Sequence, residues 1–123
     1  MKQKDPKFQI GDRVSHKPDL YGCTESVVSS FTRIFSNNDG GLAYLERNLK
    51  SMRDEIKWEI IEGDEPVLVI HPYPSTEWSI SENRMVECMT RESRVVFSGY
   101  AYTVKSEKMN TIFSEGSLKK VNN

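Results

Sequence analysis

The spacing of apolar residues changes along the chain, and each change predicts a different element. Between residues 26 and 35 β-branched and aromatic side chains alternate with polar ones, which predicts a long strand. A Gly11-Asp12 turn precedes it and opens a first short strand at Val14. The turn-forming residues 36–41 end the long strand. The N-terminal third is therefore expected to be β.

After residue 41 the apolar period becomes about 3.6, which favours a helix. The apolar positions that share this stripe are Leu42, Leu45, Leu49, Met52 and Ile56. Whether residues 57–61 continue the helix or form a strand stays open, because Ile56, Trp58 and Ile60 fit both periods.

A second helix is predicted to begin near Ser79. Ser79 and Glu82 have the spacing of a capping box, and Met85, Val86 and Met89 recur at helical intervals. Both predicted helices fall in the middle of the chain.

The C-terminal third returns to β. Strands are predicted at 67–70, 94–97, 99–104 and 111–113, each with a β-branched or aromatic run. One tight helical turn is expected over residues 115–118, and a closing strand over 119–121. The fold class predicted is thus mainly β with α decoration.

The composition suits one soluble domain covering residues 1–123. The chain has 123 residues, of which 37% are hydrophobic and 28% charged. Barrel strands are expected from residues 8–35 and 94–121, with a helical insertion over 39–93. No apolar run is long enough to cross a membrane, the N-terminus lacks a signal peptide, and Cys23 and Cys88 are 65 positions apart. These features predict a cytoplasmic protein with reduced thiols.

Charge narrows the possible partners. The net charge of -1 argues against strong non-specific binding to nucleic acid, where many Lys and Arg side chains contact phosphates. Cations nevertheless cluster locally. Arg47, Lys50 and Arg53 are three residues apart on the first predicted helix, and further arginines follow at Arg84, Arg91 and Arg94.

If the two helices pack together, these cations could converge on the phosphates of a ligand, which arginine binds bidentately. The alternative is an ordinary solvated face with nearby glutamates as counterions. Among aromatic residues, Trp78 lies in a polar stretch where a core role is hard to explain, so it is expected to contact a ligand or another subunit. The predicted ligand-binding residues are Arg47, Lys50, Arg53, Trp78, Arg91, Arg94 and Asn110.

No pattern predicts catalysis, a metal ion or a cofactor. His16 and His71 lie in no motif with a nucleophile, and the cysteines lack the spacing of zinc ligands. Gly40-Gly41 before the first predicted helix is read as a turn and cap in preference to an anion site. The protein is therefore not expected to be an enzyme.

Both ends of the chain carry a resemblance. The aromatic-x-x-Gly-Asp-x-Val unit of residues 8–14 and the Glu-x-x-Leu turn of residues 115–118 are similar to the ends of small SH3-like barrels of the tudor and KOW types. The resemblance implies a closed small barrel in which the last strand pairs near the first. Residues 39–93 depart from that pattern.

Length, barrel ends and helical decoration together are also similar to the Thoeris anti-defence proteins of phages, which sequester nucleotide immune signals. That resemblance implies a homo-oligomer, in the host cytoplasm, whose pockets at subunit boundaries hold cyclic ADP-ribose isomers without cleaving them. The function expected is non-enzymatic sequestration of a small phosphorylated nucleotide. The alternative is an SH3-like module that binds a protein partner or nucleic acid.

Overall fold

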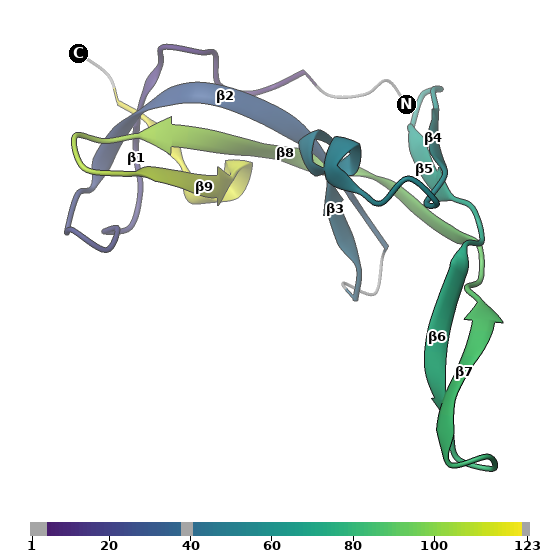
Figure 1. Ribbon diagram of the computed structural model, residues 1–123. Coiled ribbons are helices and arrows are strands. Elements are labelled where there is room, and N and C mark those ends of the chain that lie inside the picture. Colours follow the sequence, from purple (N-terminus) through teal and green to yellow (C-terminus); the bar gives the residue numbers. More distant parts are fainter. Residues whose placement is uncertain (1–4, 38–40, 122–123) are drawn as a thin grey trace.

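A computed structural model describes residues 5–37 and 41–121, and this part of the chain is almost entirely β (Figure 1). Two short 3-10 helices interrupt the strands. The strands are β1 (Arg13–Ser15), β2 (Glu25–Ser36), β3 (Ala43–Leu45), β4 (Trp58–Ile61), β5 (Val67–Ile70), β6 (Pro74–Ser79), β7 (Arg84–Met89), β8 (Ser93–Lys105), β9 (Asn110–Ser114) and β10 (Lys119–Lys120), and the 3-10 helices are η1 (Glu46–Ser51) and η2 (Glu115–Ser117).

Two long antiparallel strands, β2 and β8, form the spine of the molecule (Figure 1). At one end of the spine, β1 and β10 continue the sheet beyond β2, and β9 lies beside β8. At the other end, β3 lies beside β2, and β5 and then β4 continue the sheet beyond β8. The result is one open eight-stranded sheet. Strands β6 and β7 form a separate two-stranded sheet.

Two irregularities in the β2–β8 pairing keep the apolar residues on one face of the spine. Ser29 is an extra residue on β2, and Ser98 is an extra residue on β8. Because side chains alternate along a strand, each bulge reverses which sequence parity faces the core. Phe97 before the second bulge and Tyr100 after it therefore lie on the same face. Gly99 beside that bulge has φ +151°, a conformation that L side chains rarely adopt.

The spine carries two hydrophobic cores. The first core, at the β1–β10–β9 end, consists of Phe8, Val14, Val28, Tyr100, Tyr102, Val104 and Leu118. The second core, at the β3–β4–β5 end, consists of Phe35, Leu49, Leu68, Ile70 and Val95. Phe97 packs against both cores. The structure is thus two small cores joined through two strands.

Tyr102 fastens the N-terminal segment to the first core. Its hydroxyl accepts hydrogen bonds from the backbone N–H groups of Lys7 (2.9 Å) and Phe8 (3.3 Å) and donates one to the carboxylate of Glu115. Phe8 meets the Tyr102 ring edge to face, with centroids 5.2 Å apart. Burial, aided by the hydrogen bond to Glu115, raises the pKa of Tyr102 to about 12.

Most predicted strands are confirmed. The strand expected at 67–70 is β5, the long strand expected at 26–35 is β2, and the two segments 94–97 and 99–104 form the single strand β8. The tight turn predicted at 115–118 is η2. The mainly β character of the chain was thus visible in its sequence.

The first predicted helix is wrong. Its stripe is divided among β3, η1 and a loop, and β4 follows, so residues 58–61 are a strand. Leu49 is buried in the second core, whereas Leu42 is 45% exposed, so one continuous apolar face does not exist. Residues 43–45 instead pair with residues 34–36 of β2, because strand pairing there competes successfully with a local helical preference.

The second predicted helix is also wrong, because residues 74–89 form the β6–β7 hairpin. Ser79 does accept the Glu82 N–H as in a helix cap, at 3.2 Å, but this bond closes a turn. Asn83, at φ +53°, reverses the chain, since asparagine tolerates that conformation. Nothing among the described residues is an α-helix, so the helical insertion over 39–93 is absent there; residues 39 and 40 lie outside the described part.

The prediction of a closed barrel is also wrong. The sheet ends at β10 on one side and β4 on the other, and β9 and β10 do not pair. Strands β2 and β8 run on past the first core to build the second, so the sheet extends instead of closing. In the described part of the chain, no helix has the length and apolar character needed to cross a membrane.

Candidate functional site: a groove on the open edge of β2

The edge of β2 opposite β8 is only partly covered. Strand β1 pairs with residues 25–27 and β3 with residues 34–36, and within the described ranges no strand pairs with residues 29–33 along this edge. The 3-10 helix η1 lies next to this interval. A groove of about 290 Å³ opens there.

The groove combines aromatic, cationic and acidic side chains. β2 contributes its central residues, η1 contributes three charged residues and β8 contributes one tyrosine. The residues that line it are Phe31, Thr32, Arg33, Glu46, Arg47, Lys50 and Tyr100. We call it the β2–η1 groove.

An ion pair attaches η1 to β2 at one wall of the β2–η1 groove. Arg33 donates two hydrogen bonds to the carboxylate of Glu46, at 2.7 and 2.8 Å, and its remaining amino group lies 3.0 Å from Glu62. The Arg33 hydrogen bonds hold the pKa of Glu46 below its ordinary value, and the same bonds raise the pKa of Arg33. Arg33 therefore has a structural role, with its charge already satisfied by two glutamates.

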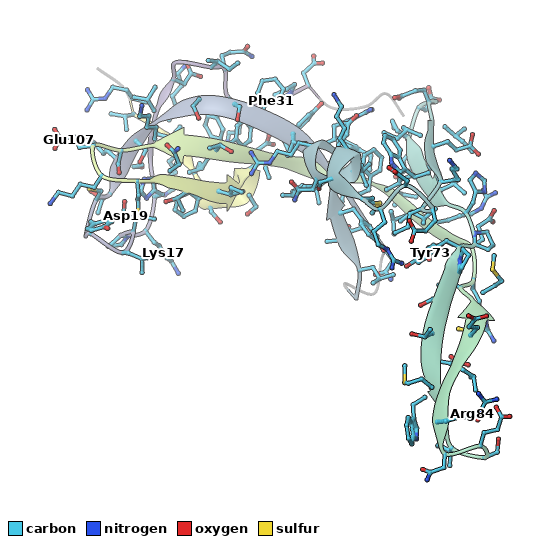
Figure 2. All side chains as sticks on the ribbon, viewed as in Figure 1. Lys17, Asp19, Phe31, Tyr73, Arg84 and Glu107 are labelled. Carbon is cyan, nitrogen blue, oxygen red and sulfur yellow. The ribbon has the colours of Figure 1, made fainter. Side chains whose placement is uncertain are left out.

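Aromatic rings form another wall. Phe31, labelled on β2 in Figure 2, is 38% exposed. Its ring contacts Tyr100 edge to face, with centroids 5.9 Å apart, and Tyr102 at 6.0 Å. Tyr100 is 7% exposed. The core thus supports one face of Phe31 and leaves part of the ring accessible from the groove.

Arg47 and Lys50 supply the positive charge of the groove. The backbone N–H of Arg47 donates to the Thr32 hydroxyl at 3.0 Å, and its guanidinium donates to the hydroxyl of Thr103. These bonds orient Arg47 across β2 and β8. Both Arg47 and Lys50 are exposed and line the β2–η1 groove. By the β2–β8 register, Thr103 lies on the opposite face of the sheet from Phe31 and Tyr100, so the Arg47 guanidinium approaches the groove from that other face.

A second and larger groove, of about 540 Å³, lies at the base of the β6–β7 hairpin. Arg53 is one of its walls; the guanidinium lies 5.8 Å from the Tyr73 ring centre and 3.7 Å from Glu55. The other lining residues are Pro74, Ser75, Thr76, Glu87, Cys88 and Met89. We call it the hairpin groove.

The structure places the predicted site residues in several separate places. Arg47 and Lys50 share the β2–η1 groove, whereas Arg53 lines the hairpin groove. Trp78 is opposite Met85 in the hairpin. The helices on which a convergence of arginines depended do not exist, and the remaining candidates occupy other positions: Arg91 between β7 and β8, Arg94 in β8 beside Glu92, and Asn110 at the start of β9.

The histidines have local partners. His16 stacks on Phe113 at 4.6 Å and its Nε2 lies 2.7 Å from the Ser26 hydroxyl. His71 lies 3.1 Å from Glu59. Among the residues that the structure describes, no three His, Cys, Asp or Glu side chains come close enough together to hold a metal ion.

Sequence reasoning missed Phe31, Thr32 and Arg33 as groove residues. In a strand pattern Phe31 reads as an ordinary core position, and its exposure follows from the open edge of β2, which depends on where β1 and β3 end. Tyr100 also lines the groove, and it shares its face of β8 with Tyr102 of the first core.

Comparison with known proteins gives no relative: no family model, curated protein or solved structure matches this chain.

Proposed function

We propose that this protein binds a small phosphorylated nucleotide in the β2–η1 groove and holds it without converting it. The observation that carries the proposal is that the accessible Phe31 ring and the exposed cations Arg47 and Lys50 line one groove. An aromatic face can stack on a nucleobase, a contact worth about 1–3 kcal/mol, and the cations can bind phosphate.

The size of the groove supports a small ligand. Its volume of about 290 Å³ is just below the range of about 300–1,000 Å³ that small-molecule sites occupy, so only a small ligand is accommodated. A nucleotide that places its base on Phe31 and its phosphate toward η1 fits this range. Cyclic nucleotides and cyclic ADP-ribose isomers, which the resemblance of the sequence suggested, belong to this chemical class.

The charge balance also supports an anionic ligand. Among the described residues that line the groove, Glu46 is the acidic one, and Arg33 is shared between it and Glu62 nearby. Arg47 and Lys50 therefore leave the groove net positive on a chain whose overall net charge is -1. We propose the cytoplasm as the compartment, because such ligands occur there and because Cys23 and Cys88 are free thiols.

The test is calorimetric titration of the purified protein with mononucleotides, cyclic nucleotides and cyclic ADP-ribose. The bound ligand is then released by heating and identified. Lys50→Ala and Phe31→Leu are expected to weaken binding about 10-fold each, while Lys57→Ala, at an exposed lysine directly before β4 that does not line the groove, serves as control. Ligand recovered intact supports holding without conversion. Absence of binding, or equal binding by Phe31→Leu, Lys50→Ala and wild type, contradicts the proposal.

A second function is favoured by the uncovered edge of β2. An extended peptide of a protein partner could add as a strand along residues 29–33 and complete the edge between β1 and β3. Phe31→Leu discriminates the two functions. It weakens the stacking on which nucleotide binding depends, but it keeps the backbone groups of residues 31 and 33, which by strand alternation face the open edge and would pair with an added peptide.

A further inference from the structure

The β6–β7 hairpin stands apart from the two cores. We call residues 74–89 the arm. Its strands pair only with each other, and the arm projects away from the large sheet, with Arg84 near its far end (Figures 1 and 2). At its base, the backbone N–H of Tyr73 donates to the Thr90 hydroxyl at 3.0 Å, and the Thr90 N–H donates to the Tyr73 carbonyl, also at 3.0 Å. A two-stranded hairpin alone is marginally stable in water, so its projection needs an explanation.

One face of the arm is apolar and uncovered. Residues directly opposite in the hairpin share a face, and the pairs on this face are Pro74–Met89, Thr76–Glu87 and Trp78–Met85. All six side chains are exposed, including Trp78 at 56%, Met85 at 53% and Met89 at 61%. Tryptophan and methionine are the residue types enriched at protein interfaces.

The chain exposes more surface than a compact protein of the same mass. A compact monomer of 14.2 kDa is expected to expose about 6,800 Å². This chain exposes 8813 Å². The excess of about 2,000 Å² belongs to the elongated chain as a whole, and it leaves ample surface for the roughly 800 Å² that each partner buries in a standard interface.

The hairpin groove at the base of the arm can receive a side chain from a second copy. The hairpin groove takes Pro74, Thr76, Glu87 and Met89 from the apolar face, the Ser75–Cys88 pair from the opposite face of the hairpin, and Arg53 from the segment after η1. When two such faces pack about a two-fold axis, the Thr76–Glu87 pairs meet at the axis. The Trp78–Met85 pair of each copy then reaches the Pro74–Met89 pair of the other.

Chemistry fits this arrangement. An indole can pack on Met89 and Pro74 while the guanidinium of Arg53 lies over its ring, which combines apolar burial with a cation–π contact. The one charged residue on the apolar face is Glu87, and the two copies of it come together near the axis. Arg53, which also lines the groove, would have to turn from Glu55, 3.7 Å away, to supply the opposite charge. A volume of about 540 Å³ accommodates the indole together with part of Met85.

We propose that two copies of this chain pack the apolar faces of their arms together, so that Trp78 of each copy enters the hairpin groove of the other. The site is incomplete without the second copy. This proposal concerns a different groove from the nucleotide proposal and does not depend on it.

The first experiment measures mass by sedimentation equilibrium from low to high micromolar concentration. Wild type is expected at twice the mass of the chain. The double variant Trp78→Ser, Met85→Ser is expected to raise the dissociation constant at least about 30-fold, the effect of losing a buried tryptophan anchor. Leu20→Ser, which removes an apolar side chain that is 90% exposed on a loop away from the arm, is the matched control and is expected to associate as wild type does.

A mixing experiment tests this reciprocal packing itself. Trp78→Ser lacks the anchor and Met89→Ser lacks part of the groove, but a mixed pair keeps one intact contact. The two variants combined are therefore expected to associate more tightly than either with itself. Circular dichroism is the check that each variant is folded. A single-chain mass for wild type at every concentration, an unchanged dimer in the double variant, or a mixed pair of intermediate affinity would each overturn the proposal.

Discussion

The arm and the rest of the described chain, which we call the body, use apolar residues in opposite ways. In the body, Phe35, Leu68 and Tyr102 are almost fully buried, and each lies in one of the two cores. In the arm, Trp78 and Met85 are more than half exposed, and no residue of the arm is among the buried hydrophobic ones. The comparison teaches that the body folds around its own side chains, whereas the arm's apolar surface is unsatisfied within one chain.

The largest difference in unfolding free energy is expected between two variants that each remove an aromatic ring, one from the body and one from the arm. Phe35→Ala should lower the free energy of unfolding by about 4 kcal/mol, since it leaves a cavity in the second core. Trp78→Ser should change it by less than about 0.5 kcal/mol when measured below the concentration of association. Urea unfolding of both variants gives these values, and equal losses would contradict the division into body and arm.

The next effect concerns the tie between the N-terminal segment and the first core. Tyr102→Phe should cost about 2 kcal/mol, because the buried backbone N–H of Phe8 loses its acceptor, whereas the Lys7 N–H keeps the Glu115 carboxylate as an acceptor. The folded pKa of Tyr102, about 12, is above the unfolded value of about 10. The stability that depends on this shift is therefore complete below pH ~10 and lost as the pH rises toward 12.

Unfolding of wild type and Tyr102→Phe at a series of alkaline pH values tests this sign. The stability difference between the two proteins should become smaller between pH ~10 and ~12. A difference that is constant across that interval would show that the hydroxyl does not titrate as the structure implies.

A smaller loss is expected at the bulge in β8. Gly99→Ala should cost about 1–2 kcal/mol, because its φ of +151° strains any residue with a Cβ even though the space around it is open. Gly63→Ala, at a glycine for which no positive φ occurs and where space is also open, is the matched control. If both substitutions have the same effect, the bulge does not require glycine.

The clamp between η1 and β2 is expected to contribute about 1 kcal/mol, since Arg33 and Glu46 are only partly exposed but still reached by solvent. Glu46→Gln should remove it at pH 7. Because Arg33 lowers the pKa of Glu46 in the folded protein, the clamp's stability is present above the ordinary glutamate pKa of about 4.3 and is lost as the pH falls further. Wild type and Glu46→Gln should therefore converge in stability at acid pH, which acid titration of the unfolding transition checks.

How much the sequence could predict differs between these regions. Strands of the body were predicted well. β5 and β8 contain β-branched residues that favour strands, and several of these residues are buried in the structure. The arm was mistaken for a helix because the spacing of Met85, Val86 and Met89 fits both structures. Asn83 in a left-handed conformation decides for a hairpin, and that conformation cannot be read from a sequence.

The candidate site was predicted in part for a similar reason. Arg47 and Lys50 are three residues apart, and a 3-10 turn brings such residues to one side as a helix does, so they share a groove although the helix is absent. The contribution of Phe31 comes from long-range pairing, because the ends of β1 and β3 leave the middle of β2 uncovered. Spacing along the chain carries no information about that gap.

Hydrogen exchange of the arm amides at two protein concentrations tests most directly whether the arm depends on a second copy. The account predicts that β6 and β7 exchange slowly in concentrated protein and rapidly in dilute protein, while β2 and β8 exchange equally slowly in both. Protection of β6 and β7 that is the same at both concentrations and matches that of the spine would contradict it, because the hairpin would then be stable within one chain.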